Sequence, residues 1–400
     1  MLGSINIVAD ENIPFVREAF EGLGRVRLIA GRSMTSASVR GADVLLVRSV
    51  TRVNEQLLAG SNVKMVATAT IGTDHIDENH LAQSGICFAS AAGSNANSVA
   101  EYVVAALLTL AERDGFELAG KTIGVVGVGN VGSKVVDKCR ALRMNVLTND
   151  PPMKEATGSS EYIELNDLLS ASDIVTLHVP LTLTGKWPTC QMVNEKFLKQ
   201  LRAGAIFLNT SRGPVVLGSA LGRELWSGRL TAVLDVWENE PAIDVELLSR
   251  VALGTPHIAG YSFDGKVNGT ARIYRAVCEF LGVEPAWNPR VIMPAPSVPL
   301  IHVDQQIGER QASIREIIKR VYDIEADDRN LRELIVLEPE QRSRYFDHLR
   351  KTYPVRREFY NTVIEFGDLP AQDMDKILSG LGFDVQLADS SLKRASGENP

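Results

Sequence analysis

Three polar residues that follow predicted strands carry side chains suited to acid–base chemistry on a small anion. His257 is suited to exchange a proton near neutral pH, because an unperturbed imidazole has a pKa of about 6.5. Arg212 is suited to hold a carboxylate in the fork of its permanently charged guanidinium. Glu240 would orient the imidazole and favour its protonated form. The oxidation of a 2-hydroxy acid requires these residue types, since a base must take the hydroxyl proton while a cation holds the carboxylate.

A glycine-rich segment upstream predicts a dinucleotide site. The segment 127–132 reads GVGNVG, follows an apolar strand pattern and opens a helix. Gly127 would permit the tight turn, Gly129 the approach of the pyrophosphate, and Gly132 close packing of helix on strand. Asp150, after the next strand, would accept hydrogen bonds from the ribose hydroxyls and repel a 2′-phosphate, which favours NAD over NADP. The alternative is a glycine-rich turn that binds no nucleotide.

The elements that must position these residues form an alternating pattern. Apolar runs typical of buried parallel strands alternate with helical patterns. A second series of alternating strands and helices follows a long helix that begins near Ser98. Prolines then mark a linker at 282–299, and a third segment follows it. The predicted strands are 5–9, 44–47, 65–69, 86–89, 122–127, 145–148, 173–179, 205–209, 231–236 and 362–366.

Composition limits the classes of protein to consider. With 400 residues, 45% of them hydrophobic and 23% charged, the chain can form two or three globular domains. A net charge of −7 argues against nucleic-acid binding. The apolar run 102–111 is too short to span a membrane, and the N-terminus lacks the pattern of a secretory signal. Four scattered cysteines indicate reduced thiols, no metal site and a cytoplasmic protein.

These motifs together resemble the D-2-hydroxyacid dehydrogenase family. The resemblance spans most of residues 90–285 and implies that Arg212, Glu240 and His257 are catalytic, with His257 as the proton donor or acceptor. The matching segments are Gly127–Gly132, Asp150, Asp173–Pro180, Asn209–Gly213, Asp235–Pro241 and Pro256–Gly260. The residues expected to bind NAD are Gly127, Gly129, Asn130, Val131, Gly132, Asp150, Val179, Thr210, Ser211, Asp235 and Gly260.

A narrower resemblance extends over nearly the whole chain. Segments 47–51, 67–77, 150–152, 257–265 and 349–358 look like the erythronate-4-phosphate dehydrogenase branch of this family. The resemblance implies NAD-linked oxidation of 4-phospho-D-erythronate to 2-oxo-3-hydroxy-4-phosphobutanoate in pyridoxal 5′-phosphate biosynthesis. It also implies a homodimer formed through the C-terminal domain.

Substrate contacts are expected in the first part of the chain. The resemblance implies that Ser49, Thr70 and Tyr261 contact the substrate. We add Arg48 as a partner of the phosphate, because a dianion needs a nearby cation; the alternative is that Arg48 pairs with a neighbouring acid. The segment at Cys190 and Gln191 departs from the family pattern, which usually has a histidine at the second position.

The predicted fold is α/β, with two doubly wound parallel-sheet lobes of Rossmann or flavodoxin type and a small C-terminal α/β dimerisation domain. We predict a substrate-binding lobe at 1–97 and 262–285, an NAD-binding domain at 98–261 and the dimerisation domain at 286–400. Two alternatives stay open: another phosphorylated-hydroxyacid dehydrogenase, such as 3-phosphoglycerate dehydrogenase, and a dehydrogenase-like corepressor that senses NAD(H). Intact Arg212, Glu240 and His257 argue against the corepressor.

Overall fold

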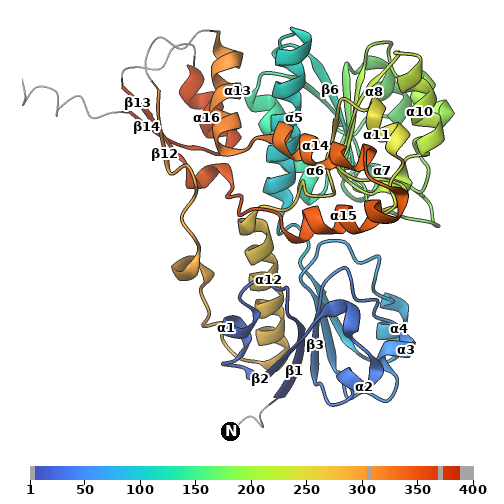
Figure 1. Ribbon diagram of the computed structural model, residues 1–400, viewed down its shortest axis with the longest axis vertical. Coiled ribbons are helices and arrows are strands. Elements are labelled where there is room, and N and C mark those ends of the chain that lie inside the picture. The colour runs from blue at the N-terminus through green and yellow to red at the C-terminus, as the bar shows by residue number, and fades with distance from the viewer. Residues whose placement is uncertain (1–4, 304–308, 368–372, 388–400) are drawn as a thin grey trace, which may run out of the picture. The chain divides into compact units, whose positions relative to one another are not determined.

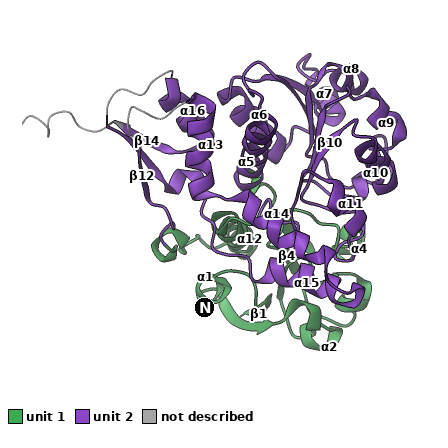
Figure 2. Ribbon diagram, turned by 45° about the horizontal axis from the view of Figure 1, so that its top comes forward, with its two compact units in different colours: residues 1–96, 261–294 green, residues 97–260, 295–400 purple. Residues whose placement is uncertain are grey.

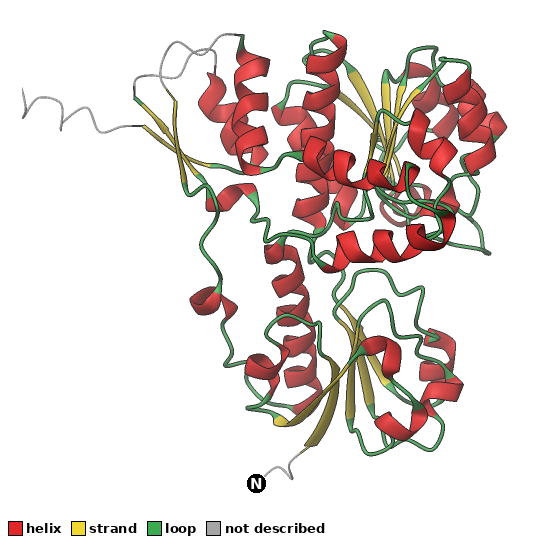
Figure 3. Cartoon of the chain, in the orientation of Figure 1, coloured by secondary structure: helices red, strands yellow, loops and turns green. Residues whose placement is uncertain are grey.

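Parallel sheets flanked by helices organise the computed structural model, which describes residues 5–303, 309–367 and 373–387 (Figure 1). This described part of the chain divides into two compact units (Figure 2). Unit 1 comprises residues 1–96 and 261–294, and unit 2 comprises residues 97–260 and 295–400. The large sheet of each unit lies between helices, whereas the three short strands near the C-terminus form a separate sheet at the margin of unit 2 (Figure 3).

Unit 1 is built on a parallel sheet with the strand order β2-β1-β3-β4-β5. Alternate residues of β1 face opposite sides, so Ile7 packs with α1 and α12 while Val8 packs with α2, α3 and α4. Both faces are therefore covered, as a parallel sheet requires. The elements are β1 Ile5–Asp10, α1 Val16–Phe20, β2 Gly24–Ile29, α2 Ser36–Val39, β3 Val44–Val47, α3 Glu55–Leu58, β4 Met65–Thr68, α4 Glu78–Gln83, β5 Cys87–Ser90 and α12 Phe263–Leu281.

Unit 2 contains a second parallel sheet, with the order β11-β10-β9-β8-β6-β7. The chain reverses its direction of travel across the sheet between β6 and β8, and ligands of such folds bind at this switch point. Its strands are β6 Thr122–Val126, β7 Asn145–Asn149, β8 Ile174–Leu177, β9 Ile206–Asn209, β10 Thr231–Leu234 and β11 Leu253–Gly254. Its helices before the linker are α5 Ala96–Asp114, α6 Asn130–Ala141, α7 Pro151–Thr157, α8 Leu165–Ala171, α9 Glu195–Gln200, α10 Gly218–Trp226 and α11 Val245–Arg250.

The C-terminal segment of unit 2 adds a smaller parallel sheet, ordered β12-β13-β14, and further helices. This segment packs into the hydrophobic core on one face of the second sheet. Its completely buried residues there are Leu331, Leu334 and Phe346. Helix α16 also packs on α6, where the Nζ of Lys138 donates to the carbonyl of Leu381 at 2.6 Å. The elements are β12 Leu300–Val303, α13 Arg310–Val321, α14 Ile324–Arg332, α15 Pro339–Lys351, β13 Val363–Phe366, α16 Met374–Leu381 and β14 Asp384–Leu387.

The predicted fold class is confirmed: two larger parallel sheets with helices on both faces accompany a smaller C-terminal sheet in the described residues. Strand β2 was not predicted, because Arg25 and Arg27 alternate with Val26 and Leu28 in this edge strand and leave no continuous apolar run. The division into three domains stays a prediction. No helix in the described ranges is long and apolar enough to cross a membrane.

Truncation of Leu334 to alanine should destabilise unit 2, because this completely buried side chain lies in its core. We expect the free energy of unfolding to fall by about 2–5 kcal/mol. The matched control is Val336→Ala two residues later, where 77% exposure predicts a change within about 0.5 kcal/mol. Urea denaturation measures both, and equal small effects would show that the C-terminal segment does not contribute to this core.

Candidate active site

The three predicted catalytic residues follow adjacent strands of the unit 2 sheet. Leu234 of β10 pairs with Asn209 of β9 on one side and with Gly254 of β11 on the other. Parallel strands end at the same edge, so the segments that carry Arg212, Glu240 and His257 all leave from one edge of the sheet.

Glu240 and His257 are in direct contact. The Nδ1 of His257 lies 2.7 Å from Oε2 of Glu240, and the backbone N–H of Trp237 donates to Oε1 at 2.8 Å. Burial raises the pKa of Glu240, but the charge and hydrogen bond of His257, with smaller effects of Trp237 and Arg350, lower it below its ordinary value. Because an ionised carboxylate only accepts, Nδ1 carries the proton and Nε2 is left as the basic nitrogen. The His257 side chain is 31% exposed, so its ring is accessible from solvent.

A buried carboxylate holds the backbone of the His257 segment. Asp235, which is 1% exposed, accepts the N–H groups of Ile258 at 2.7 Å and Ala259 at 3.0 Å. Its backbone carbonyl accepts the N–H of His257 at 2.7 Å. His257 has a φ of 57°, a left-handed conformation that costs a non-glycine residue roughly 1–2 kcal/mol. The hydrogen bonds to Asp235 therefore stabilise a conformation that histidine rarely adopts.

The segment with Arg212 is fixed against the one with Glu240. Asn209 accepts from the backbone N–H of Ser211 at 3.0 Å and donates to the carbonyl of Arg212 at 3.0 Å. A Cβ atom on Gly213 would lie 1.8 Å from the carbonyl oxygen of Trp237, so only glycine allows this approach. Arg212 is half-buried and donates from Nη1 to the carbonyl of Ser211. The structure thus places Arg212 at the same edge as the His257–Glu240 pair.

The glycine-rich turn has the geometry that a pyrophosphate needs. Gly127 has a φ of 85°, and a Cβ there would meet the carbonyl of His178 at 2.7 Å. A Cβ on Gly132 would lie 2.0 Å from the carbonyl of Gly127, so helix and turn pack closely. A Cβ on Gly129 meets no atom within 4 Å, which leaves open space beside the start of α6. The residues of the turn therefore fit the phosphates of NAD at a helix N-terminus.

Asp150 lies where the ribose of NAD is expected, and it also stabilises the glycine-rich turn. Its Oδ2 accepts the backbone N–H of Val128 at 2.7 Å, and its Oδ1 caps α7 by accepting the N–H of Met153 at 3.0 Å. Hydrogen bonding to ribose stays a prediction. The sequence alone did not indicate that the same carboxylate also ties β7 to the glycine turn.

His178 has a structural environment beside the turn. Its ring nitrogens lie 3.0 Å from Oγ1 of Thr176 and 3.3 Å from Oγ1 of Thr210. Burial lowers the pKa of His178 to about 3, so the ring is neutral. Val179 packs against Gly127, whose added Cβ would lie 2.9 Å from Cγ1 of that valine. These contacts hold Val179 and Thr210 at the edge where NAD is expected.

Three of the predicted substrate contacts in unit 1 lie at the carboxyl edge of its sheet. Arg48 and Ser49 follow β3, and Thr70 follows the neighbouring strand β4. Thr70 lies 2.7 Å from the hydroxyl of Thr68, and Lys266 lies over the ring of Tyr261, 4.5 Å from its centroid. Arg48 is half-buried and forms no hydrogen bond or ion pair through its side chain with the residues that the structure describes.

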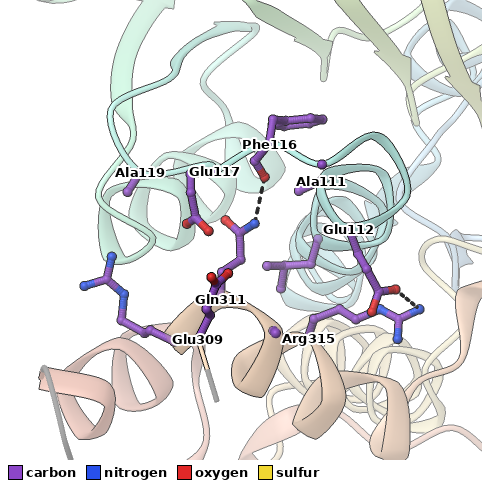
Figure 4. Close-up of a pocket in the computed structure, with 12 residues that line it drawn as sticks. Ala111, Glu112, Phe116, Glu117, Ala119, Glu309, Gln311 and Arg315 are labelled. Carbon is purple, nitrogen blue, oxygen red and sulfur yellow. Dashed lines mark hydrogen bonds and ion pairs between the residues drawn. The ribbon is translucent and has the colours of Figure 1, made fainter. Parts of the chain in front are cut away.

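A pocket of about 800 Å³ lies elsewhere in unit 2, between the end of α5 and α13 (Figure 4). Some of its polar groups are paired: Gln311 donates to the carbonyl of Phe116 at 2.8 Å, and Arg315 pairs with Glu112 at 2.7 Å. None of the predicted site residues lines it. The described residues also contain no cluster of three or more histidines, cysteines or acids that could hold a metal ion.

Comparisons with known proteins identify the family. Residues 92–259 match the model of the D-isomer specific 2-hydroxyacid dehydrogenase NAD-binding domain, and residues 292–382 match a domain of unknown function, DUF3410. The erythronate-4-phosphate dehydrogenase of Cronobacter sakazakii is 42% identical over 95% of this chain and 98% of its own length. The erythronate-4-phosphate dehydrogenase of Salinibacter ruber is 46% identical over 94% of this chain and 98% of its own length.

This chain belongs to the erythronate-4-phosphate dehydrogenase family. A solved D-lactate dehydrogenase from Aquifex aeolicus, in complex with NAD and lactic acid, is similar over 69% of this chain and 95% of its own, with 26% identity and a TM-score of 0.56. The predictions of family, of an NAD-dependent 2-hydroxyacid dehydrogenase and of NAD as cofactor are confirmed. The roles of individual site residues stay predictions.

The lowered pKa of Glu240 predicts how its contribution to stability depends on pH. The ionised group stabilises the fold fully above its ordinary pKa of 4.5, and this contribution is lost as the pH falls through the lower value of the folded state. Glu240→Gln should therefore be less stable than the wild type at pH 6, and the difference should shrink towards pH 3. Urea denaturation across this range measures it. The exposed Glu117→Gln is the control, and an equal, pH-independent difference in both variants would contradict the prediction.

Proposed function

We propose that this dehydrogenase oxidises 4-phospho-D-erythronate at C2 to 2-oxo-3-hydroxy-4-phosphobutanoate, within pyridoxal 5′-phosphate biosynthesis. The observation that carries the proposal is the 2.7 Å pair of His257 and Glu240 at the sheet edge that also carries Arg212. Relatives that match over nearly their full length bear the name of this reaction, which supports the choice of substrate.

The proposed roles follow from the geometry. Nε2 of His257 takes the hydroxyl proton as the C2–O bond becomes a carbonyl, and Glu240 stabilises the imidazolium that forms. Arg212 holds the substrate carboxylate and the carbonyl oxygen as it develops. When NAD is bound, its nicotinamide accepts the hydride that leaves C2. In the reverse direction, His257 returns the proton.

We assign the binding of NAD to the residues at the carboxyl edge of the unit 2 sheet. Gly127, Gly129 and Gly132 with the start of α6 would hold the pyrophosphate, and Asp150 the ribose. The open space beside Gly129 supports this assignment. The residues proposed to complete the site are Asn130, Val131, Val179, Thr210, Ser211, Asp235 and Gly260.

The substrate phosphate and hydroxyls would be held by unit 1. Arg48 is proposed to pair with the phosphate, because it is a half-buried cation at the end of β3 without an acidic partner among the described residues. Ser49, Thr70 and Tyr261 would donate hydrogen bonds to the same ligand. We also propose a cytoplasmic homodimer that associates through the domain predicted at 286–400.

The purified enzyme with NAD should produce NADH, followed by its fluorescence, when 4-phospho-D-erythronate is supplied. We expect kcat/KM to exceed that for 3-phospho-D-glycerate by about tenfold or more, because a site built for the additional hydroxymethylene group loses those contacts with the shorter substrate. Unphosphorylated D-erythronate is the control for the phosphate. Faster oxidation of 3-phospho-D-glycerate would refute the proposed substrate.

Removal of the proposed base should abolish most turnover. We expect His257→Ala to lower kcat by roughly 10²–10⁴-fold, because the hydroxyl proton then has no acceptor held in place. His302→Ala is the matched control, since that histidine is 66% exposed and pairs with Glu365 in the C-terminal sheet. Steady-state kinetics would exclude the role if both variants kept the activity of the wild type.

A further inference from the structure

A buried arginine of the C-terminal segment contacts the backbone that carries the proposed base. Nη2 of Arg356 donates to the carbonyl oxygen of Ala259 at 2.8 Å and to Oγ of Ser98 at 2.7 Å. Ser98, in the first turn of α5, donates in turn to the same carbonyl at 2.9 Å. The carbonyl of Ala259, two residues after His257, is thus held by two donors.

With this contact, two N–H groups and the last carbonyl of the segment 257–259 are hydrogen-bonded to buried side chains. Asp235 holds its N–H groups from one side, whereas Arg356 and Ser98 hold its last carbonyl from the other. The segment needs such restraint, because the left-handed His257 would relax to a more favourable backbone conformation if its neighbours were free to move.

The burial of Arg356 indicates that these hydrogen bonds matter. The residue is 6% exposed and forms no ion pair within the described part of the chain, and Nε and Nη1 have no hydrogen-bond partner there. A buried charge is costly unless it is compensated. The ring of Tyr322, 4.0 Å from the guanidinium, and the two acceptors beside the His257 segment compensate this charge in part. Although burial lowers the pKa of Arg356, the negative charges of Glu101 and Asp327 also stabilise the guanidinium and help to raise that pKa above its ordinary value. An apolar side chain would fill the space at lower cost but would leave the carbonyl of Ala259 with one donor.

We infer that Arg356 is a positioning residue for the dehydrogenase reaction: the C-terminal segment uses it to hold the backbone of the His257 segment. The inference rests on the proposed role of His257. It gives the C-terminal segment a part in catalysis within a single chain, in addition to the proposed dimerisation.

The test compares Arg356→Met, which removes the guanidinium donor and leaves Ser98 as the donor to the carbonyl of Ala259, with the wild type. We expect kcat for 4-phospho-D-erythronate to fall about 10–100-fold, because displacements of the order of 1 Å have effects of this size. KM should change less than about threefold, since the proposed phosphate contacts are not on this segment. Hydrogen–deuterium exchange of the peptide 256–262 should become faster. Arg356→Lys, which keeps the charge but replaces the fork by a single ammonium, should be intermediate in both measurements.

Arg332→Met is the matched control, because Arg332 also comes from the C-terminal segment and donates to two backbone carbonyls, those of Leu248 and Val251. The Arg332→Met variant should have a lower free energy of unfolding than the wild type. Its kcat should stay within about twofold of the wild-type value, and hydrogen–deuterium exchange of the peptide 256–262 should not change.

A folded Arg356→Met with wild-type kcat and wild-type exchange would overturn the inference. If that variant does not fold, Arg356→Lys decides, and unchanged kcat and exchange in it would overturn the inference equally. A wild type inactive on 4-phospho-D-erythronate, with faster exchange in the Arg356 variants, would instead refute the proposed substrate and leave the positioning role standing.

Discussion

The carboxylate of Asp235 organises the candidate active site. It is almost completely buried, and burial raises its pKa, although the charge of His257 and hydrogen bonds from Thr255, Ile258 and Ala259 lower it in part. The hydroxyl of Thr255 contacts Tyr102 of α5 at 2.7 Å, which links this acid to the long helix. An acid placed to accept backbone N–H groups converts a strained turn into a fixed support for an imidazole.

The sequence predicted the parts of the site whose chemistry is local. The glycine turn, with Asp150 one strand later, follows a spacing that backbone geometry dictates, and the structure gives it an open position at Gly129. The pairing of Glu240 with His257 could be expected from residue type, because imidazole and carboxylate are complementary in charge. Their 2.7 Å contact could not be predicted without the strand order, because it depends on β10 lying beside β11.

Other features could not be predicted because they depend on contacts distant in sequence. Arg356 reaches Ala259 across almost a hundred positions, and nothing in the residue types around it indicates a buried guanidinium. Leu331, Leu334 and Phe346 belong to no element predicted from the sequence, and only the folded chain shows which core they enter. The edge strand β2 was not predicted because its arginines alternate with apolar residues, and it therefore lacks the continuous apolar run of a buried parallel strand.

The entry of Leu331, Leu334 and Phe346 into the core of unit 2 has a consequence for the size of the smallest working enzyme. A chain cut at the linker near residue 294 would expose the apolar surface that these side chains cover and would lose the donor to Ala259. A working shorter enzyme would therefore need polar substitutions on that face in addition to the deletion.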